Sequence, residues 1–189
     1  QRPLDPSLVA GIGFDATCSL VVVPNRDLPD SQIAQSMKSW FAVDTAAYGS
    51  TDIIMWMDHR AAKEAIIINA TKHPALRYVG GSVNMEMQLP KILWMHGHGD
   101  LKTVYRLFDL SDWLVWWATG GKSGDMRSVC TVGCKWTYVA NDIAGDVDAK
   151  KGWQRDLFAA LGLEGILAQN DFEKIGKDVV NIGSCVGRL

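Results

Sequence analysis

The stretch Ser19-Leu20-Val21-Val22-Val23, closed by Pro24-Asn25, indicates the fold class most clearly. A short apolar run that is rich in β-branched residues and ends in turn formers is typical of a buried strand. A second apolar run at residues 8–14 precedes it, and the polar link at residues 15–18 predicts that the two form a β-hairpin. Residues 52–57 are a third run of strand length.

Helical patterns alternate with these strands. Asp58 stands where a helix N-cap is expected, ahead of a helix at residues 59–72 that Pro74 ends. Residues 24–51 are interpreted as a connector or insertion that holds a short helix at residues 33–40. Glycines stop three more predicted helices, which cover residues 90–97, 111–119 and 153–161. The alternation favours an α/β class with a sheet flanked by helices.

Composition excludes several classes of protein. Of the 189 residues, 48% are hydrophobic and 21% are charged, which is typical of a globular domain. The formal net charge of −2 provides no basic field for nucleic acid, and no apolar run approaches the ~20 residues of a membrane span. The spacing of Cys130 and Cys134 is not that of a metal site, so we expect no metal, reduced thiols and a cytoplasmic location. Because the chain begins with Gln1, we expect a fragment or a processed chain.

Two nucleotide-binding motifs match only in part. Gly11-Ile12-Gly13-Phe14-Asp15-Ala16 fits the dinucleotide fingerprint, but it lies inside a predicted strand and opens no helix. A dinucleotide oxidoreductase therefore stays only as a third hypothesis. Gly121-Lys122-Ser123 resembles the end of a P-loop, yet Trp116 occupies the position of the first glycine. His96 and His98 are interpreted as part of a solvated turn.

Four patches combine polar, aromatic and small residues at the ends of predicted elements, and chemically they suit a polyol. Trp56 and Trp136 could stack on the C–H face of a sugar. Carboxylates can accept, and cationic side chains can donate, hydrogen bonds to hydroxyl groups. Simpler roles stay open, because Asp58 could be only an N-cap, Trp56 only core, and Arg60 only a partner of Asp58 or Glu64. The four patches are residues 13–19, 56–60, 80–91 and 134–138.

Six ordered blocks carry a resemblance to a known family. The chain resembles the FGGY carbohydrate kinases from about residue 8 to residue 183, and the branch that it resembles most is the D-ribulokinase type of pentulose kinase. The blocks are IGFDATCSLVVV (12–23), IMWMDHRA (54–61), INATKHP (68–74), VGGSVNMEMQLPKILWM (79–95), LFDLSDWLVWWATG (107–120) and SVCTVGCKWTY (128–138).

The resemblance implies a domain with the ribonuclease H-like fold of the actin/hexokinase superfamily. Such kinases transfer the γ-phosphoryl group of ATP to a terminal sugar hydroxyl with the help of Mg²⁺, here expected on a pentulose such as D-ribulose or on a pentitol. Residues 1–189 would be the sugar-side part of the N-terminal domain, without its first strands and without the ATP-binding C-terminal domain. The base aspartate would lie beyond residue 189, so the chain alone is expected to be incomplete and inactive. A homodimer of the full-length protein is a further expectation.

The resemblance also implies a set of sugar-binding positions. A loop at Asp15, Ala16 and Thr17 would line the site, and Trp56 would form its wall. Four features depart from the family pattern: Trp117 replaces an arginine, residues 120–127 are altered, residues 96–99 lack the usual lysine and following proline, and residues 26–51 look longer or drifted. A non-catalytic sugar-binding domain or a decayed kinase is therefore the alternative. The expected binding residues are Asp15, Ala16, Thr17, Trp56, Asp58, Glu86 and Lys135.

Overall fold

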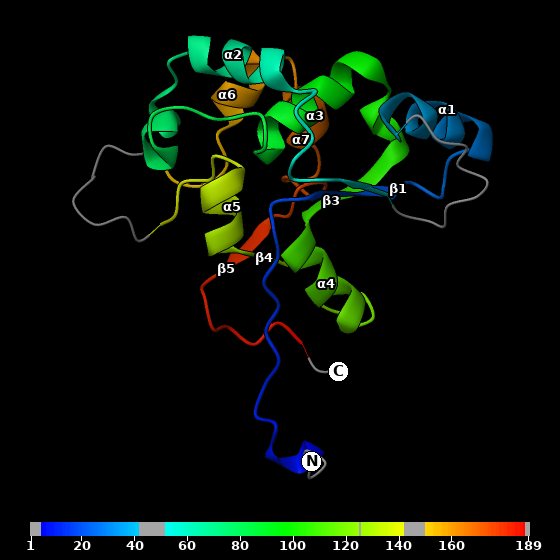
Figure 1. Cartoon of the computed structure of the whole chain (residues 1–189), viewed down its shortest axis with the longest axis vertical. Helices are drawn as coiled ribbons and strands as arrows, with labels where there is room; N and C mark the ends of the chain where they lie inside the picture. Colours follow the sequence, from blue (N-terminus) through cyan, green and yellow to red (C-terminus); the bar gives the residue numbers. More distant parts are fainter. Residues whose placement is uncertain (1–4, 42–51, 125, 142–149, 188–189) are drawn as a thin grey trace.

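The computed structural model describes residues 5–41, 52–124, 126–141 and 150–187. Its helices and strands alternate along the chain, as Figure 1 shows. In chain order they are η1 (Pro6–Leu8), β1 (Leu20–Pro24), α1 (Asp30–Phe41), β2 (Asp52–Ile54), α2 (Ala62–Ala70), η3 (Pro74–Val79), α3 (Gln88–His98), η4 (Leu101–Thr103), β3 (Val104–Asp109), α4 (Leu110–Ala118), β4 (Met126–Ser128), α5 (Val129–Lys135), α6 (Arg155–Ala160), α7 (Glu164–Leu167) and β5 (Asp178–Val180).

The larger sheet has three strands in the order β2-β1-β3, and β1 is antiparallel to both neighbours. Leu20 pairs with Ile54 on one side and with Asp109 on the other. The start of β1 therefore lies beside the carboxyl ends of β2 and β3. A smaller sheet pairs β4 with β5 in parallel.

Both faces of β1 are covered, which explains its uninterrupted apolar sequence. Leu20 and Val22 join the main core with residues of α1 and α3. Val21 and Val23 point to the other face and pack with Phe108 and with side chains of α4. Figure 1 shows α4 on one side of the sheet and α1, α2 and α3 on the other. The prediction of a buried strand at residues 19–23 and of flanking helices is confirmed.

The predicted strand at residues 8–14, and with it the hairpin, is wrong. These residues form no strand, and Leu8 and Ile12 are 76% and 60% exposed. A strand needs a partner for its backbone groups, but both edges of β1 are already taken by β2 and β3. Figure 1 shows this segment running away from the body of the molecule.

The predicted helices are confirmed at α1, α2, α3, α4 and α6, with one correction at the start of α2. The N-cap of α2 is Ala61, not Asp58, and it makes no side-chain capping bond. The third predicted strand is shorter than expected and ends at Ile54. Part of the expected connector, residues 42–51, lies outside the described residues.

Two further observations concern membrane-spanning helices and the state of the cysteines. Within the described ranges, no helix is long and apolar enough to cross a membrane. All four cysteines belong to the described residues, and each is a free thiol.

Candidate functional site

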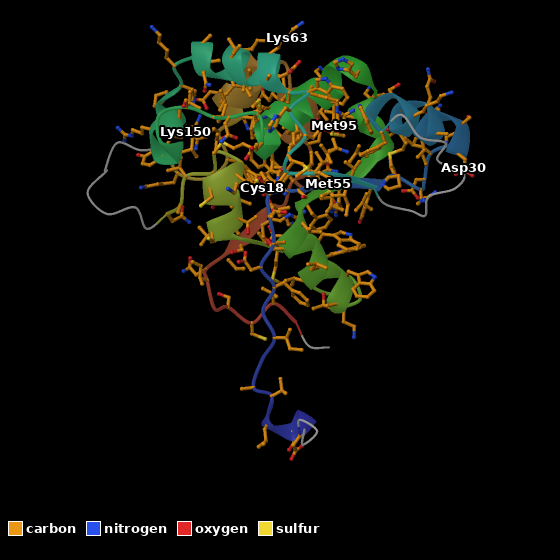
Figure 2. The ribbon with its side chains drawn as sticks, in the orientation of Figure 1. Cys18, Asp30, Met55, Lys63, Met95 and Lys150 are labelled. Carbon is orange, nitrogen blue, oxygen red and sulfur yellow. The ribbon has the colours of Figure 1, made fainter. Side chains whose placement is uncertain are left out.

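Five segments meet at one edge of the larger sheet. They are the start of β1, the ends of β2 and β3, the start of α3 and the end of α5. Figure 2 labels Cys18 and Met55 at this edge, where the pairing of Leu20 with Ile54 places them. The start of α3 joins them through a hydrogen bond of 2.9 Å from Lys91 Nζ to the carbonyl oxygen of Cys18. We call the polar residues gathered here the sheet-edge cluster: Asp58, Glu86, Gln88, Lys91, Asp109 and Lys135.

The centre of the sheet-edge cluster is buried. Gln88, Lys91 and Asp109 are each at most 2% exposed. Gln88 Nε2 donates to Asp109 Oδ2 over 2.6 Å, while Gln88 Oε1 accepts no hydrogen bond from the described residues. Burial raises the pKa of Asp109 to about 6, although the Gln88 hydrogen bond and the charges of Lys135 and Lys91 oppose the increase. Burial likewise lowers the pKa of Lys91, against the charges of nearby carboxylates that include Asp109.

Asp58 is held as an ionised carboxylate beside this centre. Burial favours a higher pKa for Asp58, but hydrogen bonds and the charge of Arg60 outweigh it and lower the pKa below its ordinary value. Arg60 Nε lies 2.9 Å from both Asp58 oxygens. The guanidinium group also donates to the carbonyl oxygen of Trp40 over 2.5 Å and stacks over Trp94 at 4.2 Å. The expected pairing of Arg60 with Asp58 is therefore confirmed, and it fixes the carboxylate rather than a helix end.

The remaining members of the cluster lie at its rim. Glu86 is one-third exposed and pairs with His59 at 3.4 Å. Lys135, the last residue of α5, is partly buried, and its charge acts on Asp109. Trp56 is partly buried too, and its backbone N–H donates to Ser19 Oγ over 3.1 Å.

The segment of Asp15, Ala16 and Thr17 precedes β1 at the same edge. Asp15 and Thr17 are exposed and Ala16 is partly exposed. The carbonyl oxygen of Thr17 accepts from Ser19 N over 2.7 Å, which bends the chain into β1. Asp15 lies near α5, because its charge helps to raise the pKa of Cys130, after burial and the neighbouring Cys134.

The structure thus connects Asp58 and Glu86 with Lys91, and Lys135 with Asp109, in one electrostatic cluster. Trp56 and the Asp15–Thr17 segment lie on the neighbouring stretches of the chain at the same edge. Gln88 and Lys91 lie within the third predicted patch but were not among the expected binding residues, and Asp109 lay in no patch. The one available signal was a glutamine and a lysine among the apolar residues of α3, which are unusual in a core.

Trp136 corrects one expectation. It is 2% exposed and packs edge-on against Trp153 with ring centroids 6.2 Å apart. A side chain this deeply buried belongs to the core and offers no face to a sugar.

A pocket of about 300 Å³ lies elsewhere, between η3 and the start of α6, and it includes none of the expected binding residues. Within its lining, Asp156 lies 3.4 Å from His73 Nε2 and 3.1 Å from Lys150 Nζ. Among the residues that the structure describes, no group of three or more His, Cys, Asp or Glu side chains could hold a metal ion.

Comparison with known proteins found close relatives among carbohydrate kinases. The chain is 39% identical over 189 residues to an FGGY carbohydrate kinase domain-containing protein of Xenopus laevis and 38% identical over 191 residues to one of Homo sapiens. It is 34% identical over 197 residues to a D-ribulokinase of Saccharomyces cerevisiae. No protein-family model matches the chain.

The matches cover nearly all of this chain but a minor part of each relative. They take in 98%, 97% and 100% of the chain, respectively, and 30%, 30% and 25% of the three relatives. The chain therefore spans less than a third of the length of these curated relatives.

Proposed function

The chain is homologous over nearly its whole length to FGGY carbohydrate kinase domain-containing proteins, and we propose that it is the sugar-side part of such a kinase. The full-length protein would transfer the γ-phosphoryl group of ATP to a terminal hydroxyl of a pentulose such as D-ribulose, or of a pentitol. The proposal includes a ribonuclease H-like fold for the complete domain, a cytoplasmic location and a homodimer. The D-ribulokinase name of the yeast relative supports the choice of sugar.

One observation carries the proposal from the side of the structure. Asp58, Glu86 and Lys135 come from three different parts of the sequence, and Lys91 and Asp109 connect them electrostatically: Asp58 and Glu86 act on the charge of Lys91, and Lys135 and Lys91 both act on Asp109. Sugar hydroxyls both donate and accept hydrogen bonds, so a site with carboxylates and an ammonium group can orient them. Hydrogen bonds to charged groups are stronger than those between neutral groups, so such a site would bind a polyol more tightly.

The roles follow from the state of each side chain. Asp58, fixed by Arg60, and the partly exposed Glu86 would accept hydrogen bonds from sugar hydroxyls. Lys135 would donate to a hydroxyl or to the ketose carbonyl. Trp56 would provide an apolar wall, and Asp15, Ala16 and Thr17 would line the entrance.

The proposal also includes the phosphate donor. ATP with Mg²⁺ would supply the phosphoryl group, and positioning plus charge neutralisation would do most of the catalytic work. The described residues hold no cluster that fits a metal ion, so we assign no contact of this chain to Mg²⁺ and no general base within it. Those groups are proposed to come from the remainder of the kinase.

The test is a kinase assay on the full-length protein with ATP, Mg²⁺ and a panel of D-ribulose, D-xylulose, L-ribulose and ribitol. We expect turnover of at least one five-carbon substrate and none by the 189-residue chain alone. Calorimetry of the same sugars with both proteins separates the alternative, a non-catalytic sugar-binding or decayed kinase domain. Sugar binding without turnover by the full-length protein would favour that alternative and refute the kinase proposal.

A further inference from the structure

Lys91 is a lysine that is almost completely buried, which is uncommon for this residue type. The residue is 1% exposed, and its Nζ donates to the carbonyl oxygen of Cys18 over 2.9 Å. A charge taken out of water is costly unless its surroundings compensate it. A lysine in this position therefore needs a physical reason beyond filling the core.

The surroundings of Lys91 supply that compensation from three elements. Asp109 at the end of β3, Asp58 after β2 and Glu86 before α3 all act on its charge. Each carboxylate also has a partner of its own, because Gln88 holds Asp109, Arg60 holds Asp58 and His59 lies beside Glu86. The charge of Lys91 thus acts on three carboxylates that come from different elements.

The hydrogen bond from Lys91 reaches the chain immediately after Asp15, Ala16 and Thr17. That segment makes no strand and is largely exposed, so few contacts hold it in place. Its end is anchored by the bond from Lys91 to Cys18 and by the buried Ser19, whose carbonyl oxygen accepts from Leu110 N over 3.0 Å and whose Oγ accepts from Trp56 N over 3.1 Å.

We propose that Lys91 is a positioning residue of the sugar site. It ties the Asp15–Thr17 segment to α3 through the Cys18 carbonyl, and its positive charge acts on Asp58 and Glu86 from within the cluster. It does not touch the sugar. The inference rests on the proposed function, because it takes those three positions as sugar-binding.

Lys174 provides a matched control within the same chain. It is a partly buried lysine whose Nζ likewise donates to a backbone carbonyl, that of Val104, and burial lowers its pKa to about 8. Val104 is the first residue of β3, whereas Asp109 is the last, so Lys174 lies at the opposite end of that strand from the cluster. Replacing Lys174 removes a similar interaction without touching the sheet-edge cluster.

The experiment compares Lys91→Met, Lys91→Arg and Lys174→Met in the full-length protein. The loss of one hydrogen bond from a charged group predicts that Lys91→Met raises the KM for the sugar at least about tenfold, while the KM for ATP changes less than about twofold. Lys91→Arg keeps the charge and a donor, and we expect it to recover most of the sugar affinity. Lys174→Met should lower the melting temperature and leave both KM values within about twofold.

Amide hydrogen exchange gives a readout that does not depend on turnover. Lys91→Met should increase exchange in peptides that cover residues 12–18, whereas Lys174→Met should not. If Lys91→Met is not recovered as folded protein, Lys91→Gln takes its place, because glutamine keeps a donor and removes the charge. The inference is overturned if the Lys91 variant changes the sugar KM and this exchange no more than Lys174→Met does. A wild-type protein that phosphorylates no sugar refutes the proposed function instead, and exchange then still tests whether Lys91 holds the segment.

Discussion

Gly99, the residue after α3, leaves room for Trp40 and offers a sharp test of the packing beneath the site. A Cβ at position 99 would lie 2.7 Å from Trp40 Nε1 and 2.8 Å from its Cε2. Trp40 is fully buried, and its Nε1 donates to the carbonyl oxygen of Met95 over 2.9 Å. The backbone of Gly99 is extended, so Gly99→Ala brings steric overlap rather than backbone strain.

The magnitude follows from two effects. Overpacking a dense core costs about 1–3 kcal/mol, and a weakened Trp40–Met95 hydrogen bond adds about 1 kcal/mol. Gly99→Ala should therefore destabilise the protein by about 2–4 kcal/mol. For a cooperative unit of 150–250 residues, each kcal/mol lowers the melting temperature by about 2–4 °C, so scanning calorimetry will detect the change. Because the Trp40 carbonyl also accepts from Arg60, the variant should weaken the hold on Asp58 as well.

Gly97→Ala is the matched control, because Gly97 lies two residues earlier, within the last turn of α3. A Cβ at position 97 meets nothing within 4 Å, and alanine in a helix is more favourable than glycine by up to about 1 kcal/mol. The two glycine replacements should thus move the melting temperature in opposite directions. A Gly99→Ala protein that melts as high as Gly97→Ala would refute the packing argument.

Three further predictions concern the site, the pH dependence and the isolated chain. Lys135→Ala in the full-length protein should raise the KM for the sugar about 10- to 150-fold, from the ~1.5–3 kcal/mol of a charged hydrogen bond, and equal changes in the KM for sugar and for ATP would contradict a sugar role. Burial raises the pKa of Asp112 to about 6, above its unfolded value of 3.8, so the folded state binds the proton more tightly than the unfolded state. The stability that this proton contributes to the protein is therefore lost as the pH rises from about 4 to about 6. Asp112→Asn should make that decline shallower in urea titrations between pH 4 and pH 7, and an unchanged slope would show that Asp112 does not titrate there. The 189-residue chain exposes 60% of Ile12 and 66% of Trp117, so we expect it to aggregate or to be partly molten, whereas a sharp thermal transition with monomeric sedimentation would count against this.

The strands show how far local pattern reaches. The run at residues 19–23 could be recognised because both faces of β1 are covered, which makes every position apolar. Strand β3 went unrecognised because Tyr105 and Arg106 interrupt its apolar residues. Arg106 is buried there beside Glu173, an ion-pair partner 2.8 Å away that stands 67 residues later in the chain. No window along the sequence contains both halves of that ion pair.

Helices α1, α2, α3, α4 and α6 and the sugar-kinase resemblance are properties of short segments, so residue order alone was enough to reveal them. Helical periodicity and glycine stops act over a few residues, and the six blocks are read one after another. The environment of Lys91 and Asp109 is different, because it depends on chain segments that are up to 73 residues apart. Burial raises the pKa of one group and lowers that of the other, and burial exists only once β1, β3 and α3 have packed together. Whether a polar residue lies on a helix surface or at the centre of a charged cluster is decided by that packing.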